Sequence, residues 1–296
     1  MNIKNHKFVT PSQSGRNSWW TYIIMALASL SGIIIFNQLM NRLLIPALKN
    51  TSFLATVGQD NISYVLIGLL FIVLYIIPKV GHRLLHHRPF RQLINTNGKP
   101  FRWKLYMKGM LQWGILLFIS QLVTDFALFE AFIDNFQWSS FLITFVLSAF
   151  GLFIQTYWEE LIFRGYLLQN IGRKFVALWV PNLIIAALFA LAHFGYGFSS
   201  LLSSGIYSVF LVFITLKDEG IERASGIHFM NNFLLLNFFV NISAVTNSTF
   251  DWTIDWLDLL TLILSACIIL QWSKAFDFLR FFGHRKGTAT RTSPTN

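Results

Sequence analysis

The chain has 296 residues, of which 54% are hydrophobic and 12% are charged, and its formal net charge is +10. Soluble domains carry about twice that charged fraction, so this chain has too few polar residues to cover a water-soluble globule. We therefore predict an all-α, polytopic protein of the membrane bilayer, and we explain the positive charge by membrane topology rather than by nucleic-acid binding.

Apolar residues form consecutive blocks separated by polar loops, and blocks of about 20 residues match the thickness of a bilayer core. Trp19 and Trp20 precede the first block as an interfacial aromatic pair. The pattern predicts about eight transmembrane helices, located approximately at residues 20–45, 61–78, 109–132, 139–168, 178–196, 199–216, 226–246 and 255–273.

Charged residues differ between alternate loops. The loop of residues 79–108 is rich in Lys and Arg and has no acidic residue. Because Lys and Arg collect in cytoplasmic loops, we predict a multi-pass protein of the cell membrane with both termini in the cytoplasm. Residues 1–18 are then a cytoplasmic tail, residues 19–282 a transmembrane domain and residues 283–296 a disordered cytoplasmic tail. The opposite loops carry Asp60, Asp125, Glu130, Asp134, Asp251 and Asp255.

An acidic pair lies within the fourth apolar segment, where an ionisable group costs at least about 2.5–3.5 kcal/mol at the helix centre. Glu160 and Arg164 are four residues apart, so they share a helix face and can form an ion pair. Glu159 lies about 100° further around the helix and has no evident partner. It is therefore the better candidate for a general base, whereas a structural Glu–Arg pair explains the other two residues.

Two further polar groups interrupt apolar segments. His193 lies near the end of the fifth segment, where a lone histidine is more often packed than catalytic. His228 and Asn232 are four residues apart in the seventh segment, so both project from one helix face. Such a pair can stabilise an oxyanion, or it can be a polar contact between helices. Asn231 points about 100° away.

Distances along the helices place these groups at similar depths. Glu159 lies roughly 20 Å from the basic end of its helix, His193 about 18 Å from Pro181, and Asn232 about 13 Å from Arg223. They can share one cavity if residues 172–180 lie at the interface, outside the helices.

Two other features have simpler explanations. His82 and His86 have a spacing that can hold a metal on a helix, but without an acidic or cysteine neighbour we expect a basic interfacial segment that touches lipid head groups. Cys267 is the only cysteine, and no basic residue lies near it in the sequence. We therefore expect Cys267 to have a packing role.

The three motifs together resemble a known family. Glu159-Glu160-x-x-x-Arg164, Phe189-x-x-x-His193 and His228-x-x-x-Asn232 are similar to the motifs of the CAAX-prenyl-protease and bacteriocin-processing family, also called Abi or type II CAAX endopeptidases. The matching core spans residues 157–232, and each motif lies in its own apolar segment.

The resemblance implies an intramembrane endopeptidase acting on membrane-associated peptide or protein substrates, such as prenylated proteins or leader peptides. Glu159 and His193 would activate water, His228 and Asn232 would stabilise the oxyanion, and Glu160 with Arg164 would support them. Two mechanisms stay open. A metalloprotease would hold a zinc ion through Glu159, His193 and His228, whereas a glutamate protease would use no metal.

Two other functions compete with this one. A catalytically inactive immunity or partner-binding protein of the same fold has no need to keep all four polar motif residues. A transporter would use the buried charges as an ion path, but it predicts inverted repeats and broken helices that the sequence lacks.

Overall fold

The computed structural model describes residues 2–49, 59–96, 98–239 and 250–272. Within these ranges the chain is helical and contains no β-strand; two isolated bridges pair Asn2 with Ala177 and Asn95 with Gly220. The prediction of an all-α fold is confirmed. The predicted C-terminal tail of residues 283–296 lies outside the described residues.

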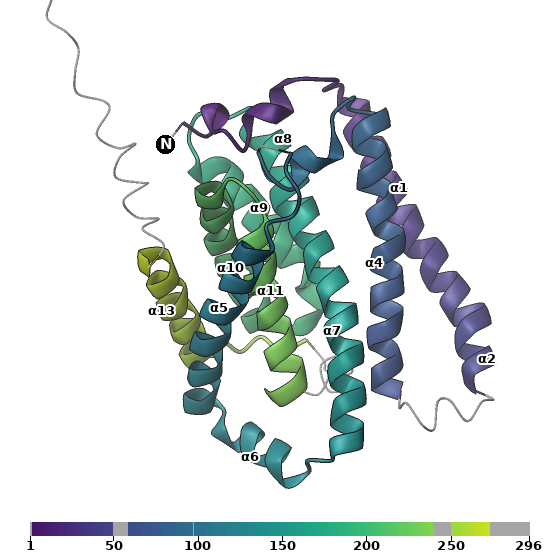
Figure 1. Cartoon of the computed structure of the whole chain (residues 1–296), viewed down its shortest axis with the longest axis vertical. Coiled ribbons are helices and arrows are strands. Elements are labelled where there is room, and N and C mark those ends of the chain that lie inside the picture. Colours follow the sequence, from purple (N-terminus) through teal and green to yellow (C-terminus); the bar gives the residue numbers. More distant parts are fainter. Residues whose placement is uncertain (1, 50–58, 97, 240–249, 273–296) are drawn as a thin grey trace, which may run out of the picture.

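Helices occur at all eight predicted segments (Figure 1). Three of them continue through π-helical turns, after α1, α7 and α11. The helices are α1 (Trp19–Leu39), α2 (Ile45–Lys49), α4 (Gln59–Leu84), α5 (Trp103–Thr124), α6 (Phe126–Asp134), α7 (Trp138–Glu160), α8 (Leu168–Gly172), α9 (Trp179–Ala192), α10 (Phe198–Asp218), α11 (Glu222–Leu234) and α13 (Trp256–Trp272).

The number of membrane-spanning helices is less regular than the sequence predicted. Four described helical stretches are long and apolar enough to cross a bilayer: Trp19–Ala47, Asn61–Leu84, Trp138–Gly172 and Phe198–Asp218. The pair α5 and α6, bent by 94° at Asp125, makes a fifth if it is one span. Helices α9 and α13 are apolar but have only 14 and 17 residues. The chain is therefore a multi-pass membrane protein, and the count of eight is approximate.

Helix α11 lies in the middle of the bundle, in contact with α5, α7 and α10. Residues 221–229 are all buried, including the charged Glu222 and Arg223. Because protein rather than lipid surrounds α11, its side chains do not have to be apolar. This explains why α11 is not among the long apolar helices named above. Polar residues at the centre of a membrane protein are the usual mark of a functional site.

Two glycines allow α5 and α11 to approach closely. A methyl group at Gly226 would collide with the carbonyl oxygen of Tyr106, and one at Gly109 would collide with that of Arg223. Small residues at such crossings let helix backbones approach within a membrane. The α5–α11 contact therefore fixes the depth and rotation of the helix that carries His228 and Asn232.

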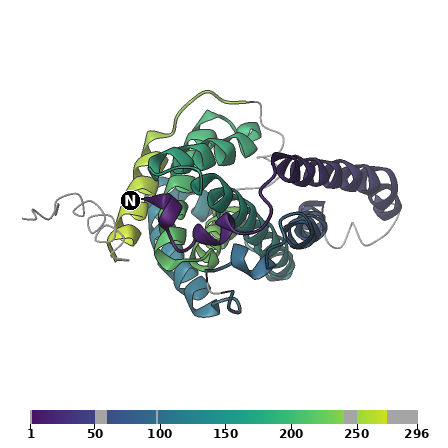
Figure 2. The ribbon, with the colours of Figure 1, turned by 90° about the horizontal axis from the view of Figure 1, so that it is seen from above.

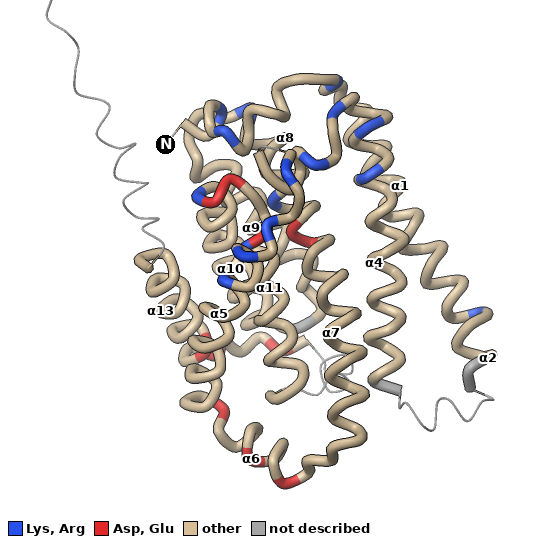
Figure 3. The backbone as a smooth tube through the Cα atoms, in the orientation of Figure 1, with Lys and Arg blue, Asp and Glu red and all other residues tan. Residues whose placement is uncertain are grey.

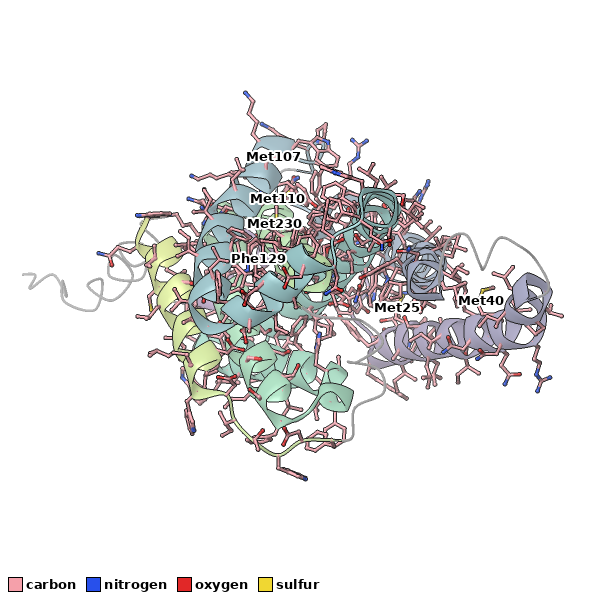
Figure 4. All side chains as sticks on the ribbon, turned by 90° about the horizontal axis from the view of Figure 1, so that it is seen from below. Met25, Met40, Met107, Met110, Phe129 and Met230 are labelled. Atoms are coloured by element: carbon pink, nitrogen blue, oxygen red, sulfur yellow. The ribbon has the colours of Figure 1, made fainter. Side chains whose placement is uncertain are left out.

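Helix α1 lies outside the main bundle, beside α4 (Figures 1 and 2). Near its beginning, Met25 is buried against Gly81 of α4, whereas Met40 lies further out, where α1 diverges from the bundle (Figure 4). Most of the large apolar side chains of α1 are exposed. An apolar exterior around a polar interior is what a bilayer environment requires.

The two ends of the bundle differ in charge (Figure 3). Lys and Arg gather at the end that contains the N-terminal segment and α8, whereas Asp and Glu mark α6 at the other end. The N-terminal segment is folded onto the basic end: Ile3, Phe8 and Val9 are fully buried, and the backbone N–H of Ile3 donates to the carbonyl of Val176. The orientation of these ends in a cell stays a prediction.

Candidate active site

The acidic pair lies where α7 changes into a π-helix. Glu159 and Glu160 are the last two residues of α7, and the π-helical segment Leu161–Leu167 follows directly. Such segments widen the helix by one residue per turn and occur frequently at functional sites. Both carboxylates are buried: Glu159 is 9% exposed and Glu160 is fully covered.

The predicted ion pair between Glu160 and Arg164 is present. Arg164 Nη1 lies 2.8 Å from Glu160 Oε1, and both side chains are completely buried. The guanidinium also lies over the ring of Phe189 from α9, 4.5 Å from its centroid. A cation above an aromatic face is stabilised by the ring quadrupole, so Phe189 compensates in part for the buried charge.

His228 of α11 joins the two carboxylates. Its Nδ1 lies 2.8 Å from Glu160 Oε1, and its Nε2 lies 3.5 Å from Glu159 Oε2. A carboxylate only accepts hydrogen bonds, so Nδ1–H donates to Glu160 and fixes the orientation of the ring. Adjacent carboxylates diverge around a helix, as the sequence predicted, but an imidazole reaches both because its two nitrogens lie on opposite sides of the ring.

The expectation that Glu159 has no partner is wrong. Gln155, one turn earlier on α7, donates from Nε2 to Glu159 Oε1 at 3.2 Å. The other oxygen, Oε2, is buried without a hydrogen bond and faces His228. A neutral amide orients the carboxylate without neutralising it. The Glu159 carboxylate is therefore oriented toward an imidazole, the arrangement that a general base requires.

His193 follows the last residue of α9 and is half-buried. Its Nδ1 lies 2.8 Å from the carbonyl oxygen of Phe189, so Nδ1–H donates there and Nε2 is the acceptor in the neutral ring. The Phe189 ring lies 4.7 Å from the His193 ring and 5.7 Å from the His228 ring. Phe189 thus places both histidines around one aromatic side chain.

Asn232 lies one turn after His228 on α11 and is half-buried. In the described part of the chain, its side chain is hydrogen-bonded to Asn231, whose Nδ2 donates to Asn232 Oδ1 at 3.2 Å, and not to the two carboxylates. Asn231 in turn accepts from Trp113 Nε1 at 3.1 Å. The Trp113–Asn231 chain holds the Asn232 carbonyl, which leaves the amide N–H groups of Asn232 to donate elsewhere.

The residues considered for zinc do not gather into a metal site. Among the described residues, no group of three His, Cys, Asp or Glu side chains is close enough to share a metal ion. The Nδ1–H groups of His193 and His228 donate to a carbonyl and a carboxylate, and metal-bound histidines make the same contacts, so these hydrogen bonds do not decide the point. The Glu159–His193–His228 zinc site that the sequence left open stays a prediction.

Three residues for which the sequence predicted no role shape the site, although Phe189 belongs to one of the motifs. Gln155 orients Glu159, Phe189 packs against Arg164 and both histidines, and Tyr207 of α10 lies 5.8 Å from His228 between ring centroids. The position of Gln155 four residues before Glu159 was a usable signal. Tyr207 had none, because its contact depends on how α10 packs on α11.

The lipid-facing interpretation of His82 and His86 is wrong, because both side chains are buried. His86 bonds to the Arg16 carbonyl through Nδ1 at 2.9 Å and to the Tyr166 hydroxyl through Nε2 at 2.8 Å. Burial lowers the pKa of His86. Since both nitrogens are engaged, His86 holds the N-terminal segment on the bundle and is not arranged as a metal ligand.

The packing role expected for Cys267 is also wrong. Its side chain is exposed on the outer face of α13, whereas the neighbouring Ser265, Ala266 and Ile269 face the bundle. The thiol therefore contributes nothing to the site.

The fold and the site together define a multi-pass helical membrane protein with a buried carboxylate–histidine centre. Residues 134–234 match the family model described as type II CAAX prenyl endopeptidase Rce1-like, and this region includes all seven residues of the three motifs. The chain is also 28% identical over 254 residues to the uncharacterized protein YyaK of Bacillus subtilis (strain 168), covering 81% of this chain and 84% of that protein. No solved structure matches it. Over residues 134–234 the chain is therefore similar to the Rce1-like type II CAAX prenyl endopeptidases.

Proposed function

We propose that this chain is an intramembrane endopeptidase that hydrolyses peptide bonds of membrane-associated substrates, with Glu159 as general base. The observation that supports it most is the position of His228, 2.8 Å from Glu160 and 3.5 Å from Glu159 in a buried site. Buried charges are costly in a membrane protein and are usually functional. The matching family model supports a peptidase rather than a transporter or an inactive scaffold.

In the proposed reaction, Glu159 takes a proton from water, and the Nε2 lone pair of His193 accepts the second O–H as a hydrogen bond. The hydroxide oxygen bonds to the scissile carbonyl carbon, whose oxygen becomes an oxyanion. The Asn232 amide and the His228 ring donate to that oxyanion. The C–N bond then breaks, and the leaving amine receives the proton held by Glu159.

Glu160 and Arg164 act as positioning residues in this proposal. The Glu160 oxygen that accepts from Arg164 also accepts from His228, so the ion pair fixes the ring. The proposal assigns no step to a metal; in the described part of the chain, no three His, Cys, Asp or Glu side chains form a group that could hold one. Prenylated proteins and leader peptides are the candidate substrates of this proposal.

The proposal is tested with protein purified in lipid nanodiscs and a library of peptides analysed by mass spectrometry. In water enriched with oxygen-18, hydrolysis places one labelled oxygen in each new carboxyl group. Labelled products with the wild-type protein, and none with Glu159→Gln, are expected. If wild-type protein yields no product from either prenylated or leader-type peptides, while remaining folded, the proposal of a peptidase is wrong.

A further inference from the structure

A cavity lies on the acidic side of the proposed catalytic centre, lined by residues of α5, α10, α11 and α13. Its volume is about 570 Å³, within the range of pockets that hold small ligands or several peptide residues. The mouth includes the exposed Asp251, Thr253 and Asp255, and the inner wall includes the buried Trp113 and Tyr207. The cavity therefore runs from the acidic surface to the interior of the bundle.

The lining of this cavity is polar and of one charge sign. Four carboxylates, Asp125, Asp251, Asp255 and Asp258, and a series of serines on α10 face it, and no Lys or Arg is among its lining residues. One Asp258 oxygen is buried without a hydrogen bond. A low-dielectric cleft with charges of one sign raises the local concentration of the opposite charge, so this lining favours a cation.

The inner wall is shared with the proposed catalytic centre. Tyr207 is 6% exposed, its hydroxyl has no hydrogen-bond partner, and its ring lies 5.8 Å from that of His228. Asn231 lines the same cavity and holds Asn232 by the 3.2 Å hydrogen bond described above. A buried hydroxyl without a partner costs free energy unless a ligand satisfies it. The cavity and the catalytic residues are thus opposite faces of one wall.

We infer that this cavity binds a positively charged segment of the peptide substrate and places the adjacent peptide bond at Glu159 and His228. The inference rests on the proposed function. A peptide is favoured over a metal ion because two of the carboxylates already accept local hydrogen bonds. Asp251 accepts from Thr253, and Asp255 accepts from the backbone N–H groups of Leu257 and Asp258. The volume also exceeds that of a single ion.

Thiol labelling tests the charge of the cavity independently of activity. Ser204→Cys, in a Cys267→Ala background, places a thiol on the cavity wall. With each rate divided by the rate of the same reagent with free cysteine, a cationic methanethiosulfonate is expected to react at least about tenfold faster than an anionic one. Because both reagents react with the same thiolate, the ratio of their rates does not depend on how far the thiol is ionised. The double variant Asp255→Asn/Asp258→Asn should bring the ratio of the two rates toward one. The control Asp134→Asn, which removes an exposed acid of α6 outside the cavity lining, should leave the ratio unchanged.

Protection identifies the ligand. Pentalysine should slow labelling of the introduced thiol by neutral N-ethylmaleimide, and pentaglutamate should not. If calcium chloride protects at low concentration and pentalysine does not, the cavity is a small-cation site and the inference is wrong. A reagent ratio near one would also overturn it.

Cleavage kinetics separate this inference from the proposed function. Among peptides cleaved by the wild-type protein, a variant with one added Lys is expected to have a kcat/KM at least about tenfold above its Glu counterpart, mainly through KM. Asp255→Asn with Asp258→Asn should remove that preference. Cleavage without any charge preference contradicts the cavity inference alone, whereas no cleavage of any peptide contradicts the proposed function and leaves the labelling results to be judged separately.

Discussion

His228 Nδ1 lies 2.8 Å from Glu160 Oε1, although the two residues are 68 positions apart in the sequence. The same oxygen accepts from Arg164 Nη1 at 2.8 Å, and the other Glu160 oxygen is buried without a partner. This single Glu160 oxygen thus links α7 to α11, and it contacts both the Arg164 guanidinium and the His228 imidazole. Removing its charge is expected to affect both folding and the geometry of the site.

Glu160→Gln should destabilise the protein by roughly 3–5 kcal/mol, because it leaves the Arg164 guanidinium buried without a counter-charge. Arg164→Gln should have a comparable effect. The double variant should be more stable than the sum of the single losses predicts, because neither charge is then stranded. Thermal unfolding in detergent measures all three; strictly additive losses would show that the pair is not coupled.

Gly226→Ala should lower both stability and activity, because the added methyl group collides with the Tyr106 carbonyl and pushes α11 away from α5. The matched control is Gly205→Ala in α10, where the added methyl group would lie 3.6 Å from the nearest atom, in ordinary contact. Overpacking typically costs about 1–3 kcal/mol. Equal melting temperatures for the two variants would show that α11 has room to move.

Stability should fall as the pH drops from about 6.5 toward 4, partly because of His6. Burial lowers the pKa of His6 from 6.5 to about 4, so the unfolded state binds a proton in this window and the folded state does not. The neutral ring accepts the Phe8 N–H at Nδ1. The full contribution is on the order of 3 kcal/mol.

His6→Asn isolates this contribution, because the Asn side chain can accept the same N–H two residues later but does not titrate. Melting temperatures from pH 7 to pH 4 should fall less steeply for the variant than for wild type. Identical slopes would show that His6 does not control the acid sensitivity.

The N-terminal segment and the loop of residues 79–108 should lie on the same, cytoplasmic side of the membrane. Arg16 N–H donates to the His86 carbonyl at 2.9 Å, so these two segments share one end of the bundle. Reporter fusions at the N-terminus and at the exposed His87 should both report cytoplasm. Opposite signals would contradict the fold, and two extracytoplasmic signals would contradict the positive-inside prediction.

Helical periodicity and charge identified much of this architecture. The ion pair of Glu160 and Arg164 depends on a spacing of four residues within one helix, so the sequence was sufficient to predict it. The division between Glu159 and Glu160 also followed from helix geometry. Both predictions concern neighbours on a single element, where distances are set by the backbone alone.

Contacts between helices could not be predicted in this way. That His228 reaches both carboxylates depends on the rotation of α11 against α7, which Gly226 and Gly109 set through close packing on α5. The lipid-facing interpretation of His86 failed because the N-terminal segment folds back over it, and Cys267 faces outward because α13 turns Ala266 toward the bundle. Tertiary packing decides each of these cases.

Glu159 is the base on which the proposed reaction depends, and the direct measurement of this role is peptide cleavage by purified Glu159→Gln beside wild type. The substitution keeps the size of the side chain and its bond to Gln155 but cannot take up a proton. A fall in turnover of roughly 10²–10⁴-fold is expected, with an unchanged melting temperature. The exposed Glu130→Gln of α6 should retain full activity. Cleavage by Glu159→Gln near the wild-type rate would contradict the account.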